Sequence, residues 1–354
     1  MTKTKKNILI GGLDWGLGHA SRMIPIINYL ISEGHNVIIA GNGSSLKLLQ
    51  ENFSFIKFIE FSGPKITYAS NKNQVIYLMF QAPRAMFKFW MQKNRLRKIV
   101  KQLGIDLIIS DNRPYFRNKK CKNIYITHQI FPLAGSSKKI LSKIATKLHL
   151  RVMRKYQYCL IPDAENENNL SGLLSHGKLP KNTKYIGWLS RFDKLESLDI
   201  QENTVLIVLS GPEPQRSILE NILHEKYRNS SKKVFLVRGT HSKQKNTFPE
   251  NFKVYDIIEN QLLIDLFSQA ETIICRSGYS SLMDLASLGR KAVLIPTIGQ
   301  VEQEYLAEYF NLKFNFKTFT QEKLININVD ELICKDCWSI CSCIDFTRVL
   351  DEII

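Results

Sequence analysis

The sequence predicts an α/β protein built from two doubly wound domains whose parallel sheets face each other across a cleft. Two observations lead to this prediction. Short apolar runs alternate with helical patterns along the whole chain. A glycine-rich turn from a strand into a helix occurs twice, at 8–22 and at 273–296. The N-terminus of a helix carries unpaired N–H groups and the positive end of the helix dipole, so each turn is suited to bind an anion.

The first half of the chain contains the pattern of one such domain. The predicted strands are 7–12, 36–41, 55–61, 106–110, 123–128 and 158–162. The predicted helices between them are 20–33, 44–51, 74–103 and 137–156. Strands that alternate with helices run parallel, because each helix carries the chain back to the starting edge of the sheet.

The second half repeats this alternation. Its predicted strands are 204–210, 233–239, 252–256, 272–277 and 291–296, and its predicted helices are 215–227, 260–269, 280–288 and 303–309. A polar and charged segment, 184–203, separates the two halves. We therefore predict an N-terminal domain of residues 1–188 and a C-terminal domain of residues 189–354.

Length and composition narrow the class of protein. A chain of 354 residues can form two domains with proper cores. It contains no run of about 18–20 apolar residues that would span a membrane, and its N-terminal apolar run is short for a signal peptide. We expect a cytoplasmic protein. Four cysteines crowd into one segment (Cys334, Cys337, Cys341 and Cys343), but no second pair completes a zinc site, so no metal is expected.

The basic charge is concentrated in the first half. Residues 1–186 contain 30 lysines and arginines against 9 aspartates and glutamates, whereas the whole chain has 49 against 32. This asymmetry predicts an anionic partner, which could be a membrane surface, an acidic substrate or nucleic acid. No RNA- or DNA-binding motif accompanies the charge, so nucleic acid is the least favoured of the three.

The first glycine-rich turn predicts a catalytic site. Its spacing differs from G-x-G-x-x-G and no acidic residue ends the second strand, which argues against a nicotinamide cofactor. Gly16 and Gly18 allow a ligand to approach the backbone. His19 lies at the start of the helix, where it could act as the general base for a hydroxyl, with Asp14 as a second candidate. The alternatives are a histidine that only hydrogen-bonds the loop and an aspartate that only shapes the turn.

The second turn predicts a site for a sugar nucleotide. Residues that close a strand and open a helix are suited to a diphosphate, and the polar residues that follow are suited to ribose and sugar hydroxyls. The candidates are Arg276, Ser277, Gly278, Tyr279, Ser280, Asp284, Gln303 and Glu304. In the loop after the predicted strand 204–210, Ser210 and Gly211 could bind phosphates and Arg216 could neutralise their charge. Arg238 lies at the end of the next predicted strand, at the same edge of the sheet.

These motifs resemble those of the GT-B glycosyltransferases, specifically the family 28 group of MurG-like enzymes. The glycine turn that ends in His19 is similar to the family's N-terminal glycine loop, and residues 275–296 are similar to its donor signature. The resemblance implies that Asp284 replaces a ribose-binding glutamate and that Gln303 matches the first of two sugar-binding glutamines. Glu304 replaces the second, which leaves the sugar open. The resemblance also implies a UDP-sugar donor on the C-terminal domain, an acceptor on the N-terminal domain, inversion at the anomeric carbon and no tightly bound cofactor.

Two basic segments predict docking on an anionic membrane. Residues 136–158 carry Lys139, Lys143, Lys147 and Arg151 at four-residue spacing, which forms one stripe on a helix beside the apolar Ile140, Ile144, Leu148 and Val152. Residues 83–102 mix basic side chains with aromatic ones that include Trp90. This combination is typical of interfacial binding, although an ordinary solvated helix face is the alternative.

The sequence therefore predicts a glycosyltransferase at the inner face of the cell membrane, acting in cell-envelope polysaccharide synthesis. It would move a hexose, GlcNAc or a related sugar, from a UDP-sugar to a hydroxyl of a lipid-linked or polysaccharide acceptor. Two alternatives remain: a nucleotide-sugar epimerase with the same fold, which would act on the donor alone, and a non-catalytic membrane-bound partner subunit.

Overall fold

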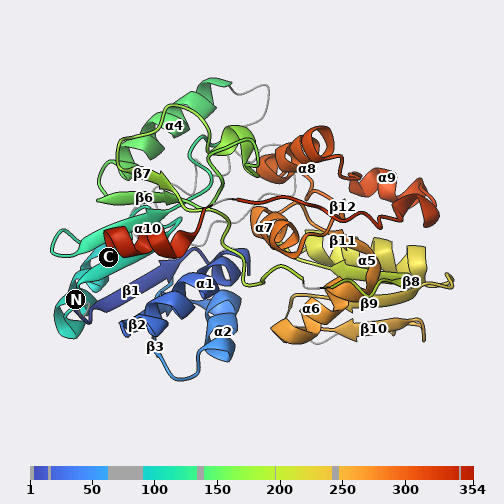
Figure 1. Cartoon of the computed structure of the whole chain (residues 1–354), viewed down its shortest axis with the longest axis horizontal. Helices are drawn as coiled ribbons and strands as arrows, with labels where there is room; N and C mark the ends of the chain where they lie inside the picture. Colours follow the sequence, from blue (N-terminus) through green and yellow to red (C-terminus); the bar gives the residue numbers. More distant parts are fainter. Residues whose placement is uncertain are drawn as a thin grey trace.

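The computed structural model describes residues 4–14, 17–62, 91–133, 139–195, 197–240, 247–342 and 344–354. Two sheets lie side by side, each flanked by helices (Figure 1). All of the strand pairs within these two sheets are parallel. The prediction of two parallel-sheet α/β domains is confirmed.

The first sheet has seven strands in the order β3-β2-β1-β4-β5-β6-β7. These strands are β1 (Asn7–Gly12), β2 (Asn36–Gly41), β3 (Lys57–Glu60), β4 (Leu107–Asp111), β5 (Lys122–Ile126), β6 (Tyr158–Ile161) and β7 (Thr183–Tyr185). The helices of this domain are α1 (Gly18–Ser32), α2 (Gly43–Asn52) and α4 (Lys139–Met153), and residues 91–103 are also helical. The predicted helix over 74–103 lies partly outside the described residues.

The second sheet has five strands in the order β10-β9-β8-β11-β12. They are β8 (Gln201–Val208), β9 (Lys233–Val237), β10 (Phe252–Tyr255), β11 (Ala270–Cys275) and β12 (Val293–Leu294). The helices are α5 (Gln215–Tyr227), α6 (Asn260–Gln269), α7 (Tyr279–Leu288), α8 (Val301–Phe314), α9 (Gln321–Asn326) and α10 (Phe346–Ile353), with a 3₁₀ turn at Asp330–Leu332. A second 3₁₀ turn, at Gly172–Leu174, lies between β6 and β7 of the first sheet. The short helices α9 and α10 were not predicted.

The central strands explain why the sheets form where they do. Ile8, Leu9 and Ile10 in β1 are almost completely buried, because β1 lies between β2 and β4 and its two faces are covered by separate clusters of apolar side chains. A continuous apolar run, rather than an alternating one, is the pattern of such a strand. The carboxyl ends of β1 and β4 meet at one edge, since Gly12 pairs with Asp111.

The last helix returns to the first domain. Figure 1 shows α10, in red, beside elements of the first sheet. The Phe346 ring packs edge-on against Tyr29 of α1 at a centroid distance of 6.2 Å. Lys184 Nζ donates to Glu352 Oε2 at 2.5 Å, and Tyr29 also donates to Asp351. The two sheets separate between β7 and β8, and the division at residues 188 and 189 stays a prediction.

Candidate active site

His19 is held by a carboxylate from the neighbouring strand. It is the second residue of α1, directly after the turn that follows β1. Its Nδ1 lies 2.8 Å from Oδ2 of Asp111, the last residue of β4. The same nitrogen lies 2.9 Å from a terminal nitrogen of Arg22. Because an ionised carboxylate only accepts hydrogen bonds and a guanidinium only donates them, the two contacts require opposite tautomers of the neutral imidazole. The tautomer that donates Nδ1–H to Asp111 is the one that can act as a base. The lone pair of Nε2 is then available, and none of the described residues hydrogen-bonds that nitrogen.

The ionisation state of His19 suits a general base. Burial and the positive charge of Arg22 lower the pKa of His19, and Asp111 raises it only partly back. The imidazole is therefore neutral at neutral pH and able to accept a proton.

Arg22 binds the same carboxylate one helical turn later. Its Nε donates to Asp111 Oδ2 at 3.0 Å, and its terminal nitrogen donates to Asp111 Oδ1. Burial alone would raise the pKa of Asp111, but the charges of Arg22 and His19 outweigh burial and lower that pKa to about 2. Asp111 therefore stays ionised and orients His19.

Asp14 lies in the same cavity with a different environment. Its carboxylate forms an ion pair with Arg113, a fully buried arginine, and accepts a hydrogen bond from the backbone N–H of Asn42 at 3.3 Å. The Asp14 carboxylate is thus engaged by two partners, whereas none of the described residues hydrogen-bonds Nε2 of His19. The geometry therefore favours His19 over Asp14 as the base and suits Asp14 to bind hydroxyl groups.

One large cavity joins the residues of both domains. It has a volume of about 1050 Å³ and is lined by ten of the predicted site residues: Asp14, Gly18, His19, Ser210, Gly211, Gly278, Tyr279, Ser280, Asp284 and Gln303. A cavity of this size can hold a sugar nucleotide together with part of an acceptor. Gly211 adopts a φ of +103°, a conformation that side chains rarely tolerate, so the turn after β8 requires glycine.

The start of α7 closes this cavity against the first domain. The hydroxyl of Ser280 donates to the carbonyl of Gly18 at 2.8 Å, and the hydroxyl of Tyr279 donates to the carbonyl of Pro162 at 2.7 Å. The Tyr279 ring also stacks on His128, with ring centres 4.1 Å apart and an angle of 1° between the planes. These contacts place the N–H groups of α7 next to the turn that carries His19.

Asp284 and Arg191 both line the cavity, and the charge of Arg191 acts on the Asp284 carboxyl. Burial raises the pKa of Asp284 to about 6, although Arg191 and a 2.7 Å hydrogen bond from Ser190 oppose that shift. Arg191 lies in the segment between the sheets, and its Nε has no hydrogen-bond partner among the described residues. Arg191 was not among the residues predicted from the sequence, because it lies in the polar segment between the two halves of the chain.

Gln303 and Glu304 lie on the first turn of α8 but differ in position. Gln303 lines the cavity, where its side chain accepts from the N–H of Thr297 at 2.9 Å and donates to Gln300 at 2.7 Å. The carboxylate of Glu304 instead accepts from the N–H of Gly299 at 2.8 Å and does not line the cavity. Glu304 therefore stabilises the loop before α8, and the predicted contact between Glu304 and the sugar is not supported by its position.

The predicted phosphate-binding arginines have other partners. Arg276 is fully buried and donates to the backbone carbonyls of Gln215, Ile295 and Pro296. Arg216 and Arg238 share the buried carboxylate of Glu220. None of the three lines the cavity. Their guanidinium groups hold parts of the second domain together in this structure, and the predicted contact with the donor stays a prediction.

The remaining predicted residues are also accounted for. Ser277 is fully buried and donates to the carbonyl of Gln303 at 2.8 Å, so it supports α8 instead of lining the cavity. Gly16, Trp90 and the side chain of Lys139 lie outside the described residues. Lys143, Lys147 and Arg151 are exposed on α4, away from the cavity.

The described residues show neither a metal cluster nor a membrane span. No group of three or more His, Cys, Asp and Glu side chains in the described part of the chain is arranged to hold a metal ion. Cys334 is buried, Cys337 and Cys341 are exposed, and Cys343 lies outside that part. Within the same residues, no helix combines the length and apolar content needed to cross a bilayer.

Two family models match the chain, one in each domain. Residues 205–335 match the glycosyltransferase family 28 C-terminal domain, a range that begins inside β8 and includes β9 to β12 and all of α7. Residues 6–132 match a glycosyl transferase family 1 model, which covers the turn with His19 and the strand with Asp111.

Relatives of the same kind cover nearly the whole chain. The sequence is 23% identical to a protein of Pasteurella multocida and 26% identical to one of Francisella philomiragia, in both cases over 92% of this chain and 89% of the relative. Both are named UDP-N-acetylglucosamine–N-acetylmuramyl-(pentapeptide) pyrophosphoryl-undecaprenol N-acetylglucosamine transferase.

Solved structures share the fold. MurG of Acinetobacter baumannii has a TM-score of 0.54 at 14% identity, over 98% of this chain and 93% of that one. The glycosyltransferase of kitacinnamycin has a TM-score of 0.61 at 15% identity, over 93% and 88%. The fold is therefore GT-B, and the chain is a glycosyltransferase whose second domain matches family 28 and whose full length is similar to MurG-like enzymes.

Proposed function

We propose that the chain transfers a hexose, GlcNAc or a related sugar, from a UDP-sugar to a hydroxyl of a lipid-linked or polysaccharide acceptor, with inversion at the anomeric carbon. The observation that carries this proposal is the single cavity in which the His19–Asp111 pair meets the start of α7. The names of the Pasteurella and Francisella relatives, which specify a UDP-sugar and a lipid-linked acceptor, support it. No feature described above favours an epimerase or a non-catalytic subunit.

Each side of the cavity has its own task in this reaction. Nε2 of His19 accepts the proton of the acceptor hydroxyl while that oxygen forms a bond to the anomeric carbon. The bond between this carbon and the diphosphate breaks, and UDP leaves with the electron pair. The N–H groups at the start of α7 and the guanidinium of Arg191 stabilise the negative charge that develops on the diphosphate. Asp284 binds the ribose and Gln303 binds the sugar.

Replacement of His19 tests the proposal. In His19→Ala we expect kcat to fall by about 10²- to 10⁴-fold, because the acceptor hydroxyl loses its base. Binding of the UDP-sugar, measured by calorimetry, should persist because the donor residues are unchanged. Release of UDP should require acceptor, which separates transfer from epimerisation. Unchanged turnover in this variant would rule out His19 as the base.

The same proposal places the protein peripherally on the cytoplasmic face of an anionic membrane. Helix α4 carries Ile140, Ile144 and Leu148, which are 75%, 52% and 54% exposed. The basic side chains of Lys143, Lys147 and Arg151 are exposed on the same helix. An exposed apolar face beside basic residues can bury itself among lipids while the charges contact anionic head groups.

Vesicle binding tests this location. The double variant Ile144→Glu/Leu148→Glu should bind vesicles of anionic and neutral phospholipid at least about tenfold more weakly, because burial of one such side chain contributes about 1.5–3 kcal/mol. Ile325→Glu, an exposed apolar position on α9, serves as the control and should bind as the unmodified protein does. Equal binding of all three proteins would contradict docking through α4.

A further inference from the structure

A chain of contacts connects the catalytic base to the donor domain. Arg22, which binds Asp111, also places its NH1 nitrogen 2.9 Å from Nδ1 of His128. His128 follows β5, and its Nε2 lies 2.8 Å from a carboxylate oxygen of Glu302 on the first turn of α8. The contacts therefore run from His19 through Asp111, Arg22 and His128 to a carboxylate of the second domain.

The direction of the hydrogen bonds follows from the chemistry of arginine. A guanidinium only donates, so Nδ1 of His128 must accept and carry no proton. The proton of the neutral imidazole is then on Nε2, where it is donated to Glu302. The stacked ring of Tyr279 fixes the plane of the His128 imidazole. His128 is thus held in one tautomer and one orientation.

The charges of this cluster are arranged to receive a proton. Arg22 and Asp111 are buried and Glu302 is partly buried, so their charges are poorly screened by water. With both histidines neutral, one positive and two negative charges are present. Protonation of His19 brings the sum to zero, whereas without Glu302 it would leave a net positive charge in a buried site. Burial would raise the pKa of Glu302, but His128, then His19 and Arg22, outweigh it and lower that pKa.

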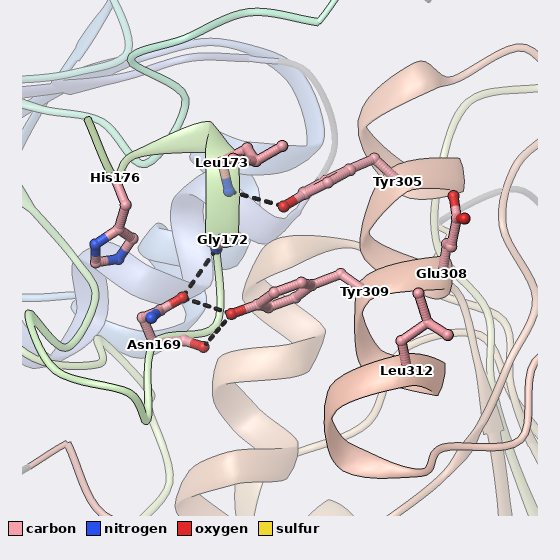
Figure 2. A pocket seen from close by; sticks show the side chains of 8 residues that line it. All are labelled: Asn169, Gly172, Leu173, His176, Tyr305, Glu308, Tyr309 and Leu312. Carbon is pink, nitrogen blue, oxygen red and sulfur yellow. Dashed lines mark hydrogen bonds between the residues drawn. The ribbon is translucent and has the colours of Figure 1, made fainter. Parts of the chain in front are cut away.

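The position of Glu302 depends on how α8 is docked on the first domain. Figure 2 shows Tyr305 and Tyr309 of α8 pointing at the segment with Asn169 and Leu173. The hydroxyl of Tyr305 accepts from the N–H of Leu173 at 2.7 Å, and the hydroxyl of Tyr309 donates to the side-chain oxygen of Asn169 at 2.6 Å. These bonds hold α8 against the first domain and thereby keep Glu302 within reach of His128.

We propose that Glu302 is a positioning residue for the transfer reaction: through His128 and Arg22 it favours proton uptake by His19, and it does so only when the two domains are closed. This inference rests on the proposed role of His19 as the base. The titratable and charged groups around His19 are Arg22 on α1, Asp111 at the end of β4, His128 after β5 and, beyond it, Glu302 on α8. Closure of the two domains over a bound donor would then bring Glu302 to His128 and so favour proton uptake by His19.

The test compares Glu302→Gln with Glu308→Gln, which removes the same charge from an exposed position of the same helix. In Glu302→Gln we expect kcat at its plateau to fall about tenfold, and the acidic limb of the kcat–pH profile to move down by about half a pH unit or more, because His19 becomes a weaker base. Donor affinity, measured by calorimetry, should change less than about twofold. Glu308→Gln should match the unmodified protein in all three quantities.

A merely structural role would lower kcat and leave the pH limb in place, and that result would overturn the inference. A histidine NMR titration of Glu302→Gln, with the His19 signal assigned from the His19→Ala spectrum, gives the proton affinity of His19 independently of activity. In a His128→Gln background, Glu302→Gln should have no further effect on the pH limb, and an additive effect would also count against the inference. If His19→Ala stays active, the base itself is wrongly assigned. If His19→Ala is inactive and the acidic limb of the kcat–pH profile of Glu302→Gln lies where that of the unmodified protein does, only the proposed role of Glu302 is wrong.

Discussion

At the scale of single residues, the cleft places an ionisable carboxyl where an uncharged group would be more stable. Asp284 lines the cavity at a site where burial raises its pKa to about 6, and the nearby Arg191 offsets only part of that cost. The hydrogen bond from Ser190 is compatible with an amide as well as with a carboxylate. We therefore interpret the carboxylate as retained for binding the ribose hydroxyls at the expense of stability.

The variant Asp284→Asn tests that interpretation. Because the pKa of the folded state is raised, the cost of the carboxylate is absent near pH 4 and grows as the pH rises through 6. We expect the variant to unfold with a free energy roughly 1–3 kcal/mol higher at pH 8 and nearly unchanged at pH 4, measured by urea denaturation. Its affinity for a UDP-sugar should fall about tenfold, because a charge-assisted hydrogen bond is lost.

Asp193→Asn is the matched control, since it removes an exposed charge from the neighbouring segment. It should change neither quantity. A stability gain of Asp284→Asn that is as large at pH 4 as at pH 8 would show that desolvation of the carboxylate is not its cause.

The residues that the sequence could indicate were those whose chemistry is local. His19 and Asp14 stand in an unusual glycine turn, and Asp284 follows a recognisable strand–helix junction. The partner of His19 was not local: Asp111 reaches it only because β4 lies beside β1. One signal was available, since Asp111 and His128 both come at the end of predicted strands, and the carboxyl ends of parallel strands meet at one edge.

The arginines show a different difficulty, because their sequence positions fit two roles. An arginine that ends a strand or opens a helix is equally consistent with a phosphate ligand and with a buried ion pair. Glu220 lies four residues after Arg216 on the same helix, a spacing typical of an ion pair, and it also binds Arg238. The sequence alone could not show that this carboxylate is buried with them.

At the scale of elements, interior strands were predicted closely and short terminal elements were not. The bounds of β1 and β2 are those predicted, because a continuous apolar run reports burial on both faces. The strand expected over 291–296 is reduced to Val293–Leu294, since Lys291 instead bonds the carbonyl of Asp336 and Pro296 has no N–H to donate. The eight residues of α10 are too few for a clear period, and α10 is stabilised by packing on α1.

The contact between α1 and α7 gives a prediction at this scale. A Cβ atom on Gly18 would lie 2.9 Å from Oγ and 3.2 Å from Cβ of Ser280. Gly18→Val should therefore push the start of α7 away from the turn with His19. We expect kcat/KM to fall about tenfold or more, because misplacement of the reacting groups is costly, while the melting temperature changes little. Adding Ser280→Gly removes the obstructing side chain and should restore part of the lost activity; no restoration would place the defect elsewhere.

At the scale of the whole molecule, the proposed function divides the two reactants between the two domains. The basic excess lies in residues 1–186, where α4 exposes Lys143, Lys147 and Arg151 to solvent. In the second domain, Arg216 and Arg238 are buried in ion pairs with acidic residues of the same domain. Exposed charges respond to salt, and buried pairs respond much less. Membrane binding and donor binding should therefore depend differently on ionic strength.

This difference can be measured on one preparation. Raising NaCl from 0.1 M to 1 M shortens the screening length from about 10 Å to about 3 Å. Binding to anionic vesicles should then fall by an order of magnitude or more, because each basic side chain near the surface contributes about 1 kcal/mol at low salt. Binding of UDP, measured by calorimetry, should change only a few-fold, because the proposed diphosphate site at the start of α7 and Arg191 lies inside the cleft. If vesicle binding did not weaken in 1 M NaCl, the apolar face of α4 would dominate docking. If vesicle binding and UDP binding weakened equally, the exposed charge would not serve membrane binding alone.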